Sequence, residues 1–313
     1  MGSLADQVRE RLRGVAVGLL TPFDEAMEVD GDALAENART LSDAGIRTFL
    51  ATANISEYHS LSQDERVYHA QTTVDALPDD ACVLAGVGGS TSNAIDLIRA
   101  YERHGVDAMM VMPPDHTYLH EQGLLEYYRK LAAATDRPLV PYVRGFDPSV
   151  DYLEGLTRVD GVAGIKYAIE DPVKLGEGIA RGADDVVWVD GLAEPYAVSY
   201  WAEGVEGFSA GVSNFRPEVG LELYDALNEG DWERARKLRN VCLPYQDLRD
   251  EVGRNNEIPA AVSVPVVKKG MELAGLNAGD GRVREPIEPL PPEVEDRAET
   301  LYERLDDDIA SLV

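Results

Sequence analysis

The sequence predicts an α/β fold in which eight parallel strands close into a (β/α)8 TIM barrel with a C-terminal helical extension. Short apolar runs and amphipathic runs alternate eight times before residue 230, which implies parallel strands joined by right-handed helical crossovers. No GxGxxG or P-loop glycine pattern appears that would favour an open nucleotide-binding sheet. Beyond Gly230 the chain carries helical periodicity alone.

Each strand is predicted where a short, mostly apolar run lies between turn residues. These runs cover residues 15–23, 47–52, 82–88, 107–113, 138–144, 162–167, 186–190 and 207–212. An amphipathic helix follows each strand, at about 32–44, 62–77, 91–104, 121–135, 152–158, 172–180, 195–202 and 218–227. Leu34, Ala38 and Leu41 share one face of the first helix. Ser62 and Glu65 form a capping box that starts the second.

Three further helices are predicted at residues 231–252, 260–274 and 293–308. The last of them has one apolar face, formed by Val294, Ala298, Leu301 and Leu305. These helices are too few and too polar to enclose a core of their own. We therefore expect a catalytic barrel over residues 1–230 and a helical extension, residues 231–313, that packs on the barrel.

The charge of the chain excludes two classes of partner. Its 313 residues include 57 Asp and Glu against 29 Lys and Arg, which gives a formal net charge of −28 and a pI of about 4.4. Nucleic acid and anionic membranes attract the opposite sign of charge, so neither is an expected partner. The acidity is spread along the chain, and lysine is scarce beside arginine. This composition indicates a surface adapted to high salt, as in a halophile.

The two cysteines indicate buried thiols and no metal site. Cys82 and Cys242 lie in apolar surroundings without CxxC or Cys/His spacing, as is typical of proteins in a reducing cytoplasm. The first residues carry no apolar core of signal-peptide length, and no run reaches transmembrane length. We expect a cytoplasmic protein that needs neither a metal nor a cofactor.

The apolar run at residues 161–168 contains one charged residue, Lys166. Burying a charged amine costs free energy, which favours its neutral and nucleophilic form. A neutral lysine can attack a carbonyl and form a Schiff base. The alternative is a lysine at the strand end whose ammonium group reaches solvent. The remaining lysines lie in polar or amphipathic helical stretches: Lys130, Lys174, Lys237, Lys268 and Lys269.

Tyr142 lies on the strand before that of Lys166, so both side chains are expected at the carboxyl ends of the strands, where barrels of this kind place their active sites. Schiff-base chemistry needs a group that moves protons, and a tyrosine beside a cation can do so. Arg144 lies two residues from Tyr142, on the same strand face. It is placed to lower the pKa of the phenol or to bind a substrate carboxylate. The alternative for Tyr142 is a packing role.

Other strand ends supply further candidates for substrate binding. Asn54, Ile55 and Ser56 form a loop whose backbone amides and short polar side chains suit a carboxylate, although an ordinary capped loop is the alternative. Ser209 on the eighth strand is a further binding candidate. His116 and Asp190, after the fourth strand and at the end of the seventh, are possible additions to the site.

These residues bring the chain close to a known family. Its sequence resembles the dihydrodipicolinate synthase / N-acetylneuraminate lyase family of class I aldolases over nearly its whole length. The matching segments are residues 14–23, 54–61, 141–144, 164–166, 207–214 and 267–275, with Arg-Glu-Pro from residue 284. The resemblance implies a Schiff base at Lys166, proton transfer by Tyr142, a 2-oxo acid substrate and a homo-oligomer, a tetramer in this family.

Departures from the family pattern point to one branch of it. The family loop usually reads Gly-Thr-Thr-Gly-Glu, but Asn54, Ile55 and Ser56 precede Glu57 here. His116 aligns where biosynthetic members carry a relay tyrosine. The arginine expected a few residues beyond the tyrosine in lysine-pathway enzymes is missing, and Arg144 sits closer. These differences favour the branches that act on 2-keto-3-deoxy sugar acids.

The leading hypothesis is a lyase that uses Lys166 on a 2-keto-3-deoxy sugar acid. Aldol cleavage to pyruvate and dehydration both remain open, because one enamine intermediate serves either reaction. Two alternatives remain beside it. One is a condensation of pyruvate of the dihydrodipicolinate synthase type, and the other is a barrel that binds a 2-oxo acid without turnover.

Overall fold

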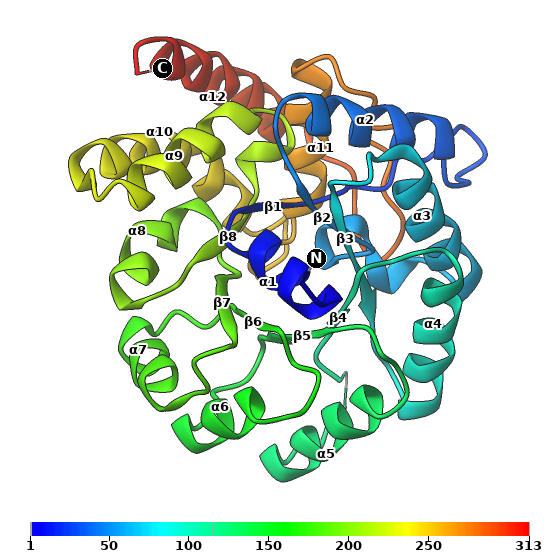
Figure 1. Cartoon of the computed structure of the whole chain (residues 1–313). Helices are drawn as coiled ribbons and strands as arrows, with labels where there is room; N and C mark the ends of the chain where they lie inside the picture. The colour runs from blue at the N-terminus through cyan, green and yellow to red at the C-terminus, as the bar shows by residue number, and fades with distance from the viewer. Residues whose placement is uncertain (1, 115, 313) are drawn as a thin grey trace.

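The computed structural model describes residues 2–114 and 116–312, and within these ranges eight parallel strands close into a barrel in chain order (Figure 1). Every strand residue is buried. The predicted (β/α)8 fold is therefore confirmed. The strands are β1 (Val15–Gly18), β2 (Thr48–Ala51), β3 (Cys82–Val87), β4 (Ala108–Val111), β5 (Leu139–Val143), β6 (Gly164–Tyr167), β7 (Val187–Asp190) and β8 (Gly207–Ala210).

One helix follows each strand and lies outside the barrel, as Figure 1 shows. Their boundaries match the predicted ranges to within two residues, the usual scatter at helix ends. The exception is the helix after β4, which ends three residues before its predicted end at residue 135. The helices are α2 (Gly31–Asp43), α3 (Gln63–Ala76), α4 (Thr91–Arg103), α5 (Glu121–Ala132), α6 (Val150–Thr157), α7 (Pro172–Arg181), α8 (Glu194–Glu203) and α9 (Pro217–Asn228).

The first strand is shorter than the predicted range of residues 15–23. Pairing in β1 ends at Gly18, and only the amide of Leu19 still donates to β2, to the carbonyl of Leu50 at 3.1 Å. Phe23 then forms an antiparallel bridge with Val29, and the amide of Asp30 donates to the carbonyl of Pro22 at 2.9 Å. The prediction was wrong here because an apolar run does not distinguish a strand from a buried segment that turns back on itself.

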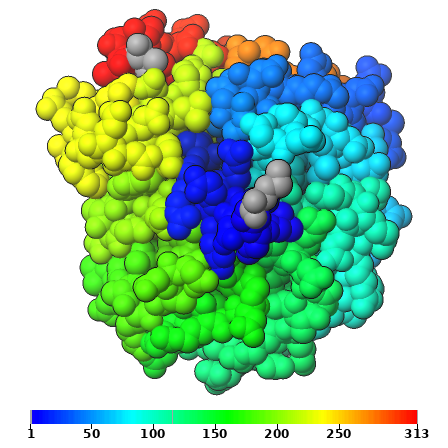
Figure 2. Space-filling view, in the orientation of Figure 1, coloured from blue at the N-terminus to red at the C-terminus, as the bar shows by residue number. Residues whose placement is uncertain are grey.

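A helix that the sequence analysis did not predict, α1 (Leu4–Leu12), covers the amino ends of the strands. Ser3 and Asp6 form a capping box that starts it, and Val8 and Leu12 are buried in the barrel interior. Figures 1 and 2 show this N-terminal segment, coloured blue, over the centre of the face in view. Because α1 fills the amino end of the barrel, space for a ligand is left at the carboxyl ends of the strands.

The barrel interior is apolar in its lower layers and polar near the carboxyl ends. Alternate residues of each strand point inward, and Leu84, Met110 and Val187 belong to one buried cluster inside the ring. Nearer the carboxyl ends the inward positions include Lys166 and Ser209. The change from apolar to polar side chains locates the chemistry at that end.

Three C-terminal helices pack against the barrel helices: α10 (Trp232–Asp250), α11 (Ser263–Leu273) and α12 (Pro292–Ala310). α10 contacts α8 and α9 as well as the two helices that follow it. Leu238, Val267 and Leu305 from these helices share one buried cluster with Leu34 and Leu223 of the barrel helices. The boundary at residue 230 stays a prediction. Within the described residues, no helix is both long enough and apolar enough to cross a membrane.

Candidate active site

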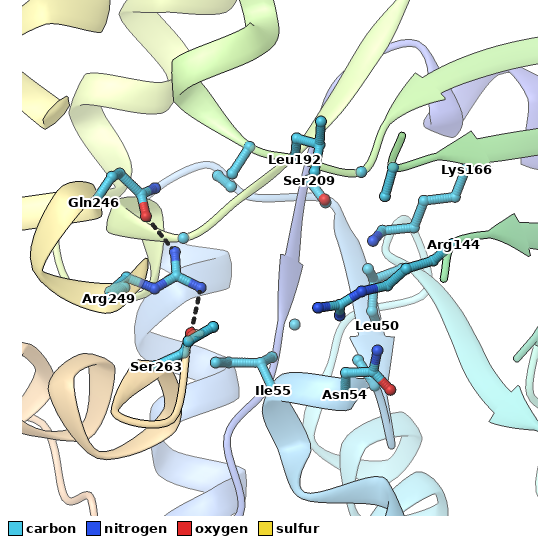
Figure 3. A pocket seen from close by; sticks show the side chains of 18 of the residues that line it. Leu50, Asn54, Ile55, Arg144, Lys166, Leu192, Ser209, Gln246, Arg249 and Ser263 are labelled. Atoms are coloured by element: carbon cyan, nitrogen blue, oxygen red, sulfur yellow. Dashed lines mark hydrogen bonds between the residues drawn. The ribbon is translucent and has the colours of Figure 1, made fainter. Parts of the chain in front are cut away.

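A cavity of about 300 Å³ lies at the carboxyl ends of the strands, and Figure 3 shows its side chains. The barrel and the C-terminal helices both contribute to its wall. Lys166 and Arg144 lie on one side of it, and Gln246 and Arg249 lie on the other (Figure 3). The polar side chains in the lining are Asn54, Tyr142, Arg144, Lys166, Ser209, Asn214, Gln246, Arg249, Asp250 and Ser263.

Lys166 and Tyr142 are directly paired across neighbouring strands. The register of β5 and β6 sets the two residues opposite each other, so both side chains point to the same side of the sheet. The Nζ atom of Lys166 lies 3.7 Å from the centre of the Tyr142 ring. Only 7% of Lys166 and 4% of Tyr142 is exposed. The amine is therefore largely buried and lies next to a phenol ring.

The surroundings of Tyr142 favour its ionised form. Burial alone raises the pKa of the phenol, but the charges of Lys166 and Arg144 and their hydrogen bonding to it outweigh burial, and the pKa lies below its ordinary value of 10.0. Arg144 directly follows β5, is exposed to the cavity and lines it. A phenol with a lowered pKa accepts and returns protons more readily near neutral pH than an ordinary tyrosine.

The loop after β2 forms a short 3-10 helix, η1 (Asn54–Ser56). Asn54 and Ile55 line the cavity. Ser56 does not: its Oγ accepts a hydrogen bond from the amide of Ala53 at 3.0 Å, and its own amide donates to the carbonyl of Ala53. The carbonyl of Ser56 accepts from Oγ1 of Thr21 at 2.6 Å. The polar groups of Ser56 thus shape η1 and do not line the cavity. Its binding role stays a prediction.

The remaining predicted residues divide into one inside the cavity wall and two outside it. Ser209 lines the cavity, and its Oγ donates to the carbonyl of Asp190 at 3.1 Å. The carboxylate of Asp190 is fully buried outside the lining and accepts from the amide of Leu192 at 2.7 Å. Strand side chains alternate, and the inward position of β7 nearest the cavity belongs to Val189. His116 is exposed, and its Nδ1 accepts from the amide of Tyr118.

Burial raises the pKa of the Asp190 carboxyl group well above its usual range, and the charge of Lys166 offsets this only in part. Asp190 is therefore a buried acid whose pKa responds to the charge of Lys166. Its side chain does not line the cavity. Among the described residues, no group of three or more His, Cys, Asp or Glu side chains is arranged to hold a metal ion.

A buried ion pair that the sequence did not reveal fixes the far end of the η1 loop. Nζ of Lys268 lies 2.7 Å from Oε1 of Glu57, and both side chains are 0% exposed. Lys268 also donates to the carbonyl of Arg282, and the amide of Arg284 donates to Oε2 of Glu57 at 2.9 Å. These bonds join the loop after β2 to α11 and the segment beyond it. They hold Asn54 and Ile55 at the cavity.

Lys268→Met should lower the free energy of unfolding by about 3–5 kcal/mol, because it leaves the Glu57 carboxylate buried without its cation. Urea unfolding followed by tryptophan fluorescence measures the change. The matched control is Lys237→Met, which breaks an exposed pair with Glu233 and should leave the free energy of unfolding nearly unchanged, because solvent screens that pair. Equal effects of the two variants would contradict a structural role for the buried pair.

The sequence analysis also missed the polar wall that α10 contributes. Gln246 and Arg249 stand three residues apart on α10, on the face that continues from the buried residues Leu238, Cys242 and Tyr245. Two polar residues on the apolar side of an amphipathic helix are the signal that could have identified this wall. The sequence alone does not say which part of the barrel that face meets.

The chain is similar to known proteins in sequence and in fold. The sequence pattern of the Dihydrodipicolinate synthetase family matches residues 11–304. The 5-dehydro-4-deoxyglucarate dehydratase of Pseudomonas putida is 29% identical over 91% of this chain and 93% of its own. The "Probable 5-dehydro-4-deoxyglucarate dehydratase" of Saccharopolyspora erythraea is 31% identical over 91% of each chain. A crystal structure of dihydrodipicolinate synthase from Oceanobacillus iheyensis superposes with a TM-score of 0.91, at 29% identity, over 97% of this chain and 100% of that one.

Proposed function

Because the chain belongs to the dihydrodipicolinate synthetase family, we propose that it is a Schiff-base lyase that removes water from a 2-keto-3-deoxy sugar diacid. The substrate is of the 5-dehydro-4-deoxyglucarate type that the names of its relatives carry. The observation that carries the proposal is the direct pairing of Lys166 and Tyr142 in the wall of one cavity. A nucleophilic amine and a proton-transfer group in contact are what imine chemistry needs.

The reaction begins when the neutral amine of Lys166 attacks the keto carbon. Loss of water from the resulting carbinolamine gives a protonated imine. The imine draws electrons from the neighbouring methylene group, whose proton leaves to give an enamine. The enamine then expels hydroxide from the next carbon, and the departing hydroxide takes up a proton, so the net loss is one water. Hydrolysis of the imine takes up one water, which balances the water lost when the imine formed, and frees Lys166.

Tyr142 is the group placed to move these protons. Its phenolate form takes a proton during imine formation or from the methylene carbon, and its phenol form returns one to the leaving hydroxide. Arg144 and the start of η1 lie at the same end of the cavity. They are placed to bind the carboxylate beside the keto group. Fixing that carboxylate aligns the keto carbon with the amine.

The similarity to a structure of dihydrodipicolinate synthase favours a second candidate, the condensation of pyruvate with an aldehyde. Both candidates form an imine at Lys166, so imine formation with pyruvate does not separate them. Turnover of a 2-keto-3-deoxy sugar acid does, because a synthase of that type starts from pyruvate. A barrel that binds 2-oxo acids without turnover would show trapping and no product in either assay.

Borohydride reduction in the presence of pyruvate or a 2-keto-3-deoxy sugar acid should attach the ligand covalently to Lys166. The reason is that reduction converts a reversible imine into a stable secondary amine. Intact mass should rise by the ligand mass less one oxygen, since imine formation loses water and reduction adds two hydrogens, and peptide mapping should locate the addition at Lys166. A label on another lysine, or no label with any 2-oxo acid in a panel, would rule the mechanism out.

A further inference from the structure

Arg249 is a cation in the cavity wall, and no carboxylate among the described residues forms an ion pair with it. It comes from the C-terminal end of α10 and lies across the cavity from Lys166 (Figure 3). Its Nη2 donates to Oγ of Ser263 at 3.3 Å and its Nη1 donates to Oε1 of Gln246, both neutral groups. Its Nε is buried, and no described residue accepts a hydrogen bond from it. A buried guanidinium nitrogen left without a hydrogen-bond acceptor is costly unless an anion joins it.

A chain of buried hydrogen bonds sets the orientation of Arg249. The carboxylate of Glu194 accepts from the amides of Gly211 at 3.1 Å and Val212 at 2.9 Å, and from Nε2 of Gln246. Because the amide nitrogen of Gln246 is used in this way, its oxygen faces Arg249. Gln246 therefore separates the buried carboxylate from the guanidinium, which is positioned without being neutralised by direct contact.

Gly211 leaves the space that Arg249 occupies. A Cβ atom at this position would overlap Nη1 of Arg249 and come within 2.8 Å of Nε2 of Gln246. The backbone of Gly211 also donates to Glu194, so one residue both anchors the chain of hydrogen bonds and makes room for its end. The residues that position the guanidinium group thus come from three places: the end of β8, α8 and α10.

The cavity is cationic although the protein is strongly acidic. Its lining carries the guanidinium groups of Arg144 and Arg249, besides the Lys166 amine, against the single carboxylate of Asp250, in a chain of net charge −28. Burial lowers the pKa of Arg249, and the charge of Arg144 lowers it further, against the opposing charges of Glu194 and Asp250. Two guanidinium groups that repel each other across one cavity are stabilised by a ligand that carries negative charge at both ends.

We propose that Arg249 binds the carboxylate at the far end of the substrate, so that the site selects 2-keto-3-deoxy sugar diacids over the corresponding mono-acids. This inference rests on the proposed lyase function, because Lys166 fixes the keto end of the molecule. Arg144 lies beside Tyr142 and serves the near carboxylate. Arg249, on the opposite wall, is left for the distal one, and its planar fork matches a carboxylate in bidentate geometry.

The test compares two six-carbon substrates that differ only at the far end. One is 5-dehydro-4-deoxyglucarate, a diacid, and the other is the mono-acid that ends in a hydroxymethyl group. The wild-type protein should prefer the diacid in kcat/KM by about 10–100-fold, the usual effect of one charged hydrogen-bonding partner. In Arg249→Gln this preference should fall toward unity. A preference that survives Arg249→Gln overturns the assignment.

Two further variants separate the role of Arg249 from general damage to the site. Gly211→Ala keeps the arginine but displaces its guanidinium, and it should reduce the diacid preference as well. Arg144→Gln removes the arginine of the opposite wall and should weaken borohydride trapping by pyruvate, which has no distal group. Trapping of pyruvate by the Arg249 and Gly211 variants shows that the lysine end is intact.

The outcomes for the two proposals are distinct. If the wild-type protein traps no 2-oxo acid at Lys166, the lyase function fails, whatever the role of Arg249. If trapping succeeds but the mono-acid is processed as well as the diacid, only the inference about Arg249 fails. If the wild-type protein instead prefers a mono-acid that is phosphorylated at the far end, the distal group of the substrate is a phosphate. This result would overturn the assignment of a diacid.

Discussion

Lys166→Met should abolish turnover of every 2-oxo acid substrate. Methionine fills a similar volume in β6 but carries no amine, so neither the imine nor the electron sink can form. The expected fall in kcat is on the order of six decades, the low end of the acceleration that enzymes provide over the uncatalysed reaction. Product assays with a 2-keto-3-deoxy sugar acid measure turnover, and borohydride trapping should show no added mass.

The matched control is Lys130→Met, which removes an exposed lysine from α5. It should leave both turnover and trapping unchanged. Lys166→Met should not unfold the protein, because it replaces a mostly buried amine by an apolar group of similar length. Its melting temperature is expected to equal or exceed that of the wild type. Near-normal turnover in Lys166→Met would show that the Lys166 amine is not the nucleophile, and its pairing with Tyr142 would then have no catalytic role.

The barrel could be predicted from the sequence because its signal is local and repeated. Each βα unit consists of a short apolar run followed by an amphipathic helix. Eight such units fit a closed barrel better than an open sheet. The neighbouring places of Tyr142 and Lys166 followed from strand order alone. In a barrel whose strands follow chain order, consecutive strands are neighbours, and the register confirms that the two residues face each other.

The predicted site residues that fall outside the cavity lining are ones whose side-chain direction depends on the exact register of a strand or loop. Asp190 ends β7 as predicted, yet Val189 holds the inward position beside it. Ser56 belongs to the predicted loop, but in η1 its hydroxyl bonds back to the amide of Ala53. A one-residue step along a strand reverses the face on which a side chain lies, and sequence patterns do not fix boundaries that closely.

The residues that were missed depend on how distant segments dock. Lys268 meets Glu57 across 211 positions of the chain, and α10 brings Arg249 to a cavity built mainly by the barrel. The helical periodicity of the C-terminal region shows that it has a buried face. It does not show what that face covers. A polar residue on such a face is visible in the sequence, but its partner becomes known only from the structure.

Tyr142→Phe should lower kcat by about two to four decades, the usual contribution of a positioned acid–base group. The ring that lies 3.7 Å from the Lys166 amine is retained, so borohydride should still trap pyruvate, although more slowly. The free energy of unfolding should change by no more than about 1.5 kcal/mol, since one hydroxyl is lost. Steady-state kinetics and urea unfolding on the same preparation measure the two effects.

The pH dependence of turnover gives a second test of Tyr142. Lys166 and Arg144 hold the pKa of the phenol below its ordinary value in spite of its burial. A phenolate base becomes available as pH rises through that pKa, so wild-type kcat should rise with pH, and Tyr142→Phe should lose that rise. The matched control is Tyr167→Phe, because Tyr167 is the next residue after Lys166 and its hydroxyl donates to the carbonyl of Asp171 outside the cavity. This variant should keep both the wild-type kcat and its pH profile. Normal turnover in Tyr142→Phe, or an equal loss in both variants, would return Tyr142 to a packing role.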